Sequence, residues 1–157
     1  MSKKELVKWS TDKITQDIIW GKIQATSDEM GIVQAKSSMS PVIYEVLDFA
    51  CGLCDNIGEV IAVQNGITIF TGTFTDDVQI IINKFKNSIN EGDIFLLNDP
   101  HKSGTHLNDV SVIKPIFYKK NLIAYAISDA HWVDIGGSVP GSMSPQATEI
   151  YEEGLQL

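Results

Sequence analysis

The sequence lacks a basic cluster, and it lacks any apolar run close to the roughly 18 residues that a transmembrane helix needs. Its 157 residues include 12 Lys or Arg against 20 Asp or Glu, a formal net charge of −8. Because nucleic-acid binding requires a basic surface, this balance excludes a nucleic-acid partner. The opening stretch, residues 1–9, has no apolar core of a signal peptide. We interpret it as a solvated terminus and expect no contact with a membrane.

Cysteine is scarce as well, and the two that occur form the pair Cys51-Gly-Leu-Cys54. A zinc site would need a second such pair or a nearby histidine, and neither is close in sequence. A thioredoxin-like pair would open a helix, whereas a turn at residues 55–58 follows here. We therefore predict two buried or half-buried thiols in a strand. Free thiols indicate a reducing compartment, so we expect a cytoplasmic protein.

The composition is that of a globular protein, with 43% apolar and 20% charged residues, and we expect residues 1–157 to form a single domain. Residues 12–35 are predicted to form a long helix. Its apolar positions recur at helical spacing and include Ile19, Ile23, Met30 and Val33. A second helix is predicted to begin at the capping residue Thr75, with acidic residues in its first turn and lysines in its last.

The remaining apolar segments indicate strands. Residues 49–54 and 59–63 are predicted to form a hairpin across the turn at 55–58. Three further strands follow at residues 93–97, 110–118 and 122–129. The polar turn at 119–121 makes the last two antiparallel neighbours. The fold class is therefore α+β, with a long N-terminal helix and a second helix packed on a largely antiparallel sheet.

All three histidines lie within residues 101–131. His106 and Asp109 stand where a loop enters the strand at 110–118, and His131 follows the strand at 122–129. If these two strands pair, the start of the first lies beside the end of the second, so the three side chains meet at one end of the sheet. Two imidazoles and a carboxylate, with positions left for water or substrate, suit Mn²⁺, Fe²⁺ or Zn²⁺.

Three more polar residues, Asp99, Asn108 and Asp134, are candidates to hydrogen-bond a ligating imidazole and fix its tautomer. We place Asp109 at a loop edge, where it would make few packing contacts. Spacing alone leaves two other interpretations open, which are an acid–base pair of a histidine with a carboxylate and ordinary loop histidines. The glycine loop at 136–142 has N–H groups that suit an anion, but it matches no nucleotide-binding motif.

Three stretches resemble signatures of the hydantoinase B/oxoprolinase family. The stretch NDPHKSGTHLNDV, from residue 98, is similar to the family's NDP and GGTHLPDV elements. The stretch AHWVDIGGSVPGSMSPQATEIYEEGL, from residue 130, is similar to AHHxDIGG and ATEIYEEGL, and DFACGLCDNIGEVIAV, from residue 48, to DFSCALFD. The resemblance runs from about residue 22 to the C-terminus. Asn108 stands where the family usually has Pro, Trp132 where a second His is frequent, and His101 has no matching role.

This resemblance implies a cytoplasmic catalytic subunit in a hetero-oligomer with an A-type subunit that uses ATP. Its substrates would be cyclic amides, as for hydantoinases and oxoprolinases, or ketones, as for the related acetone carboxylases. In the carboxylase branch two His and one Asp hold a metal, and the matching positions are His106, Asp109 and His131. The resemblance names no further catalytic residue in this chain.

Length is the largest departure, because family members are several times longer. We therefore expect the N-terminal portion of a hydantoinase B-like subunit, truncated or split, that is inactive without its partner or the missing residues. A function of another class stays open, namely a non-catalytic module that keeps the fold and docks a partner subunit.

Overall fold

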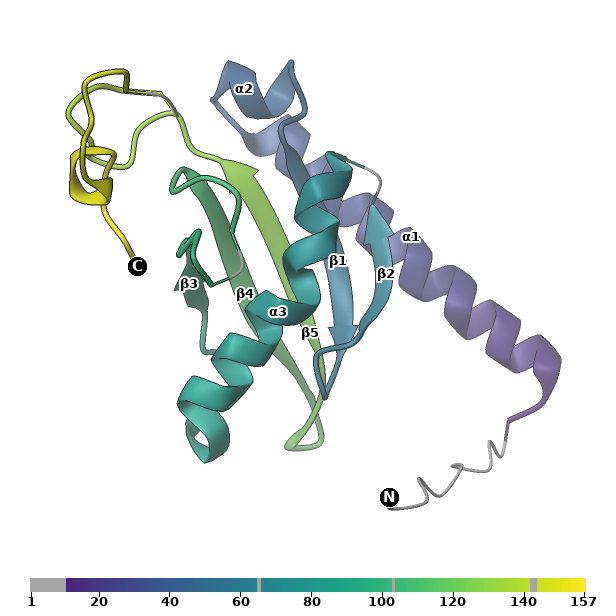
Figure 1. Cartoon of the computed structure of the whole chain (residues 1–157). Coiled ribbons are helices and arrows are strands. Elements are labelled where there is room, and N and C mark those ends of the chain that lie inside the picture. The colour runs from purple at the N-terminus through teal and green to yellow at the C-terminus, as the bar shows by residue number, and fades with distance from the viewer. Residues whose placement is uncertain (1–10, 65, 103, 142–143) are drawn as a thin grey trace.

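A computed structural model describes residues 11–64, 66–102, 104–141 and 144–157. The opening stretch 1–9 lies outside these residues, so its interpretation stays a prediction. A five-stranded antiparallel sheet forms the centre of the protein, with strand order β2-β1-β5-β4-β3 (Figure 1). Its strands are β1 (Phe49–Asp55), β2 (Val60–Gln64), β3 (Phe95–Leu97), β4 (Asp109–Tyr118) and β5 (Asn121–His131). The predicted α+β class, the hairpin and the β4–β5 pair are confirmed.

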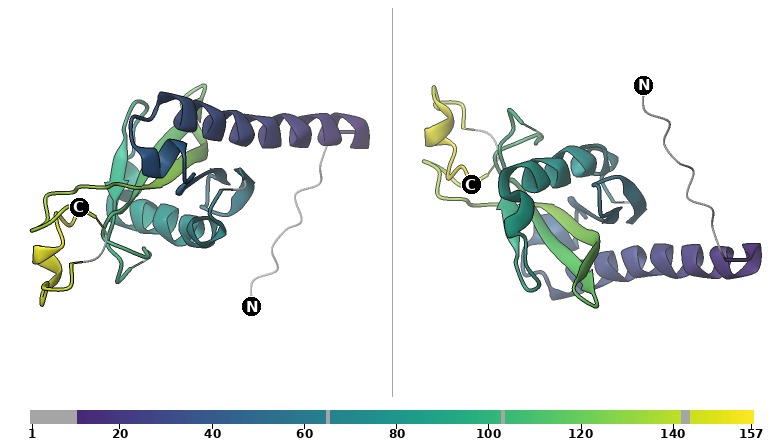
Figure 2. Two further views of the ribbon diagram at one scale, coloured as in Figure 1. Left: turned by 90° about the horizontal axis from the view of Figure 1, so that it is seen from above. Right: turned by 90° about the horizontal axis from the view of Figure 1, so that it is seen from below.

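Two long helices lie on opposite faces of the sheet (Figure 2). They are α1 (Lys13–Ser37) and α3 (Thr68–Phe85), and the shorter elements are α2 (Pro41–Tyr44), η1 (Lys86–Ser88) and η2 (Ile150–Glu152). Asp12 caps α1 by accepting a hydrogen bond from the backbone N–H of Thr15 at 3.0 Å. None of the described helices is both long and apolar enough to span a bilayer.

The predicted start of the second helix at Thr75 is wrong, because α3 begins seven residues earlier at Thr68. Phe70 and Phe74 extend the apolar stripe of the helix backward by two turns, and both are buried in the core between α3 and the sheet. Tertiary packing thus overrides the weak helix preference of the Thr- and Gly-containing segment before Thr75. The two acidic residues assigned to the first turn lie in mid-helix, and one of them, Asp77, is buried.

Only part of the apolar stripe predicted for α1 packs on the sheet, where Met30 contacts the buried cluster of β1 and β5. Ile19 and Val33 are 48% and 57% exposed, whereas the buried positions are Ser27 and Gly31. Ser27 donates a hydrogen bond to the carbonyl of Cys51 at 3.3 Å, and a Cβ at Gly31 would lie 2.6 Å from the side chain of Gln64. Small and polar residues therefore let this helix approach β1 and β2 closely.

The two cysteines are free and buried in β1, as predicted. Cys54 packs with the core beneath α3 and Cys51 with the cluster beneath α1, so they face opposite sides of the sheet. Burial raises the pKa of Cys51 to about 11 and that of Cys54 to about 12. Neither thiol is therefore ionised near neutral pH, which argues against metal binding or redox exchange at this pair.

The turn between β4 and β5 sets the register on which the site depends. Lys119 and Lys120 occupy its two central positions with φ of 48° and 68°. A two-residue turn with both residues at positive φ matches the right-handed twist of the paired strands. From this turn the ladder runs to the far end of both strands, where Asp109 faces His131.

Candidate metal centre

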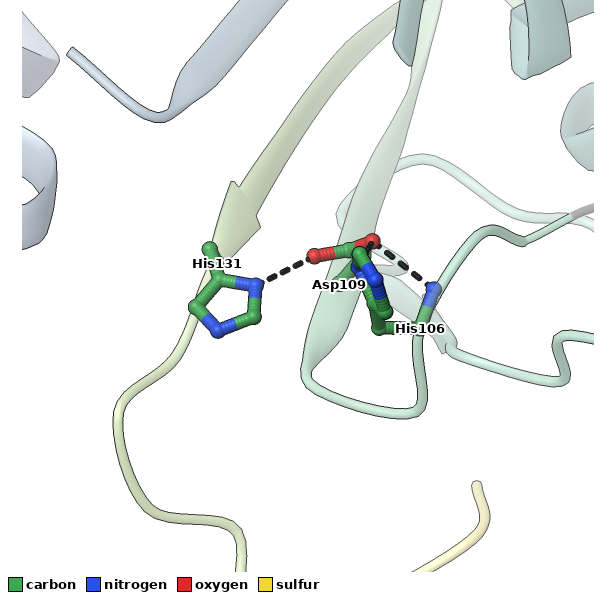
Figure 3. A group of neighbouring side chains, drawn as sticks. All are labelled: His106, Asp109 and His131. Carbon is green, nitrogen blue, oxygen red and sulfur yellow. Dashed lines mark hydrogen bonds and ion pairs between the residues drawn. The ribbon is translucent and has the colours of Figure 1, made fainter. Parts of the chain in front are cut away.

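His106, Asp109 and His131 come together at the end of the β4–β5 ladder, as the sequence predicted (Figure 3). Asp109 is the first residue of β4 and His131 the last of β5, and they are cross-strand partners. Their side chains therefore project from the same face of the sheet. His106 reaches the same point from the turn before β4, which is closed by a hydrogen bond from the N–H of Asp109 to the carbonyl of His106 at 3.1 Å.

Asp109 holds the two imidazoles together. Its Oδ1 lies 2.6 Å from Nδ1 of His131, and its Oδ2 lies 3.0 Å from Nδ1 of His106. The same Oδ2 accepts a hydrogen bond from the backbone N–H of His106 at 2.8 Å and another from the hydroxyl of Thr105. Asp109 is only 2% exposed. Asp109 does lie at a loop edge, as the first residue of β4. The prediction that it would make few contacts is wrong, because residues 104–108, the ligand loop, and β5 both contact its side chain.

The donor set fits a divalent metal. One ligand atom from each of the three residues can be chosen so that all lie within 4.8 Å of one another. Donors around such an ion, at bond lengths of about 2.1 Å, stand about 3 to 3.5 Å apart, so small side-chain movements would complete a site. Each ring turns Nδ1 to Asp109, and the second ring nitrogen of His131 points away from the carboxylate (Figure 3). Two binding arrangements are therefore open to an ion. It can replace the protons between Asp109 and the two Nδ1 atoms, or it can bind the second ring nitrogens while Asp109 orients the rings.

The two rings differ in their access to solvent. The side chain of His106 is 56% exposed and that of His131 is 10% exposed. The rings meet edge to face, with centroids 5.8 Å apart. The site is therefore accessible to solvent at His106 and buried at His131.

The three residues predicted to orient the imidazoles have other hydrogen-bond partners among the described residues. Asp99 pairs with Lys102 at 2.6 Å, which lowers the pKa of its carboxyl group, and Asp134 accepts the N–H of Gly136 at 2.8 Å. The side-chain Nδ2 of Asn108 donates to the backbone carbonyl of Trp132 at 2.6 Å, and the backbone carbonyl of Asn108 accepts the backbone N–H of Trp132 at 2.8 Å. These two hydrogen bonds join the residues next to Asp109 and His131 and so hold the two strand ends together. The side chain that contacts both imidazoles is that of Asp109.

The glycine loop uses its N–H groups within the C-terminal segment. Gly136 bonds to Asp134, Ser138 to the carbonyl of Glu152 at 2.8 Å, and Gly141 to the carbonyl of Val133 at 2.6 Å. Ser142 lies outside the described residues. These contacts leave the anion interpretation without support at the three N–H groups that are bonded.

Sequence reasoning missed a buried polar network that lies next to the three residues along β4 and β5. The hydroxyl of Ser111 lies 2.7 Å from Oδ2 of Asp129 and 2.9 Å from Oδ2 of Asp77, which comes from α3. Ser111 and Asp129 are cross-strand partners two residues from Asp109 and His131. Burial, with Asp77, Asp109 and Asp48 adding negative charge nearby, raises the pKa of Asp129 to about 7. The predicted β4–β5 pairing already implied the Ser111–Asp129 contact, but the misplaced start of α3 hid Asp77.

Comparison with known proteins relates the chain to longer ones. An uncharacterised protein of Methanocaldococcus jannaschii is 39% identical over 147 residues, which are 92% of this chain and 26% of that protein. The caprolactamase subunit beta of Pseudomonas jessenii is 34% identical over 148 residues, which are 94% of this chain and 26% of the subunit. This chain therefore spans about a quarter of the length of these relatives.

Two solved structures share the fold. The ATP-dependent caprolactamase from Pseudomonas jessenii matches with a TM-score of 0.85 and 33% identity, over 95% of this chain and 26% of that one. Nucleotide-free acetone carboxylase matches with a TM-score of 0.85 over 93% of this chain and 20% of that one, but at 23% identity this likeness concerns the fold alone. The model of the Hydantoinase B/oxoprolinase family matches residues 12–157. The chain belongs to the Hydantoinase B/oxoprolinase family.

Proposed function

We propose that this chain is the metal-bearing part of a subunit that opens cyclic amides within an ATP-dependent, cytoplasmic complex. Family membership and the similarity to a caprolactamase subunit support the reaction class. The observation that carries the proposal is the buried carboxylate of Asp109, held between the imidazoles of His106 and His131. A buried carboxylate with two histidines is costly to desolvate, and ion binding would offset that cost.

The chain's own residues would divide the work by their exposure. His106, Asp109 and His131 would hold Mn²⁺, Fe²⁺ or Zn²⁺, which polarises a carbonyl oxygen as a Lewis acid. Without an ion, Asp109 holds both rings through its two oxygens, and Thr105 and the His106 N–H hold Asp109 in turn. For all three residues to bind one ion, that ion would have to replace the protons between Asp109 and the rings. The exposed side chain of His106 leaves an approach for the amide, while the burial of His131 limits the access of water on its side.

A second candidate is acid–base catalysis by His131 in the same reaction. The 2.6 Å hydrogen bond between its Nδ1 and Oδ1 of Asp109 favours this role, because it leaves the other ring nitrogen to accept or deliver a proton. Metal content separates the two candidates. The likeness to acetone carboxylase is one of fold and adds nothing in favour of ketone carboxylation.

The partner and the rest of the active site belong to the same proposal. The name of the caprolactamase subunit beta states that the relative is one subunit of a larger enzyme. We infer that this chain works in a hetero-oligomer with an A-type subunit that uses ATP. Since the chain spans 26% of that relative, residues beyond this region would complete the substrate pocket.

A chimera tests the proposal. This chain replaces the matching quarter of the Pseudomonas jessenii caprolactamase subunit beta, and ATP-dependent ring opening of caprolactam is measured in the complete enzyme. We expect activity with the unaltered chain and with the control His101→Ala. We expect its loss with either His106→Ala or His131→Ala. A chimera that stays active without both histidines, or one that folds and assembles but is inactive with both present, would refute the proposal.

A further inference from the structure

Asn98 lies directly after β3, outside the metal centre, yet it contacts the ligand loop, which carries His106 and leads into Asp109. Its side chain is 2% exposed and has every polar group in use. Nδ2 donates one hydrogen bond to the carbonyl of Leu107 and one to the carbonyl of Leu155, both at 2.8 Å. Oδ1 accepts the backbone N–H of Leu157 at 2.7 Å. A primary amide has two donor hydrogens and one acceptor oxygen, so this geometry suits Asn and no charged residue.

These three hydrogen bonds join segments that are far apart in sequence. Leu107 follows His106 and precedes Asp109 by two residues, and its side chain is 1% exposed, so the ligand loop is anchored at that residue. Residues 155 and 157 belong to the C-terminal segment, which returns toward β3 in Figure 1. Asn98 is thus the point at which the sheet edge, the ligand loop and the C-terminal segment meet.

We propose that Asn98 is a positioning residue that couples the C-terminal segment to the geometry of the metal centre. It holds the carbonyl of Leu107 and thereby sets the loop conformation in which the His106 N–H and ring both reach Oδ2 of Asp109. Its other two hydrogen bonds make that conformation depend on the docking of residues 155–157. The effect on metal binding rests on the proposed function, whereas the effect on the loop does not.

The coupling predicts a distinct pattern of variant effects, because Asn98 bonds to the ligand loop and to residues 155–157 through different hydrogen bonds. Removal of residues 155–157 takes away two of its three partners and leaves only Leu107. Asn98→Asp keeps the shape and the acceptor but turns a carboxylate oxygen toward two carbonyl oxygens, which repel it. Two changes that act through one network are not additive, whereas independent losses of stability would add.

The variants are therefore Asn98→Asp, a chain that ends at Gly154, and the two changes combined. Asn90→Ala is the matched control, since this exposed residue precedes β3 and its side-chain amide donates to the nearby carbonyl of Ser88. The first readout uses protein without metal and follows hydrogen exchange of the His106 amide. The second is the affinity for Mn²⁺ and for Zn²⁺, each titrated against a competing fluorescent chelator.

We expect His106 amide exchange about 10-fold faster in both single variants, with the central amides of β4 and β5 unchanged, because the opening is local. We expect metal affinity to fall about 10-fold or more, as it does when a group that supports a ligand is removed. The combined variant should be little worse than the worse single one, and Asn90→Ala should match the parent.

The outcomes separate the two proposals. Unchanged His106 exchange in Asn98→Asp overturns the positioning role whether or not metal binds. If the parent binds metal and Asn98→Asp binds it with the same affinity, the coupling to the centre is overturned. If the parent binds no metal but the variants show faster His106 exchange than the parent, Asn98 positions the loop and the proposed function alone fails. Additive losses in the combined variant contradict a shared network.

Discussion

Replacement of Asp129 by Asn should stabilise the protein at alkaline pH. Asp129 is 3% exposed and its pKa is raised to about 7, chiefly by burial. Its Oδ1 has no hydrogen-bond partner among the described residues, while Oδ2 contacts the hydroxyl of Ser111. The amide of Asn has the same shape and can donate to that hydroxyl, which then donates to Asp77. The variant therefore keeps the network and removes an ionisable group from a buried site.

The magnitude follows from the shift in the pKa of Asp129 from 3.8 to about 7. The folded-state pKa lies above the unfolded value, so the folded protein holds the proton more tightly. Stability is therefore greatest below about pH 4 and falls as pH rises through 7. About three pKa units correspond to roughly 4 kcal/mol in full, of which about 2 to 3 kcal/mol is lost between pH 5 and 8. The Asn side chain does not titrate, so the variant should not show this loss.

Urea denaturation at pH 5 and pH 8, in the presence of a chelator, measures the effect. The free energy of unfolding of the parent, relative to the variant, should drop by about 2 to 3 kcal/mol from pH 5 to pH 8. Asp28→Asn, at an exposed position of α1, is the matched control and should leave the pH dependence of the parent unchanged. Equal pH dependence in the parent and in Asp129→Asn would refute the buried, proton-holding role of Asp129.

Two further predictions concern the scaffold. Lys119 and Lys120 both adopt positive φ, which Asn and Gly tolerate better than Lys, so we replace the pair by Asn-Gly. We expect the free energy of unfolding to rise by about 1 kcal/mol and the melting temperature by about 2–4 °C. An unchanged melting temperature would contradict the turn geometry. Gly52→Ala places a Cβ 2.8 Å from the buried ring of Phe74, and we expect a loss of about 1–3 kcal/mol in urea denaturation. A neutral result there would contradict the close packing of α3 on β1.

The sequence predicts the fold well where local signals are strong. The polar turn at Lys119 and Lys120 fixes the β4–β5 pairing, and that pairing alone places Asp109 opposite His131. The position of His106 follows from its spacing of three residues from Asp109. The predicted strand pairing therefore suffices to bring the three residues together, although spacing alone does not decide what they bind.

Features that depend on packing between distant segments are not predictable in this way. The early start of α3 depends on Phe70 and Phe74 meeting the sheet, and local helix preference is silent on that contact. The face of α1 that packs has the close approach at Ser27 and Gly31 at its centre and coincides only in part, at Met30, with the predicted apolar stripe. The role of Asn98 depends on hydrogen bonds to residues up to 59 positions away.

The central claim is that His106, Asp109 and His131 bind a divalent metal, and elemental analysis of the purified chain tests it most directly. The parent, His101→Ala and the double variant His106→Ala/His131→Ala are each reconstituted with Mn²⁺, Fe²⁺ or Zn²⁺, desalted and analysed by mass spectrometry. We predict about one equivalent of one of these metals in the parent and in His101→Ala, and none in the double variant. Equal metal content in all three proteins, or none in the parent, would contradict the claim.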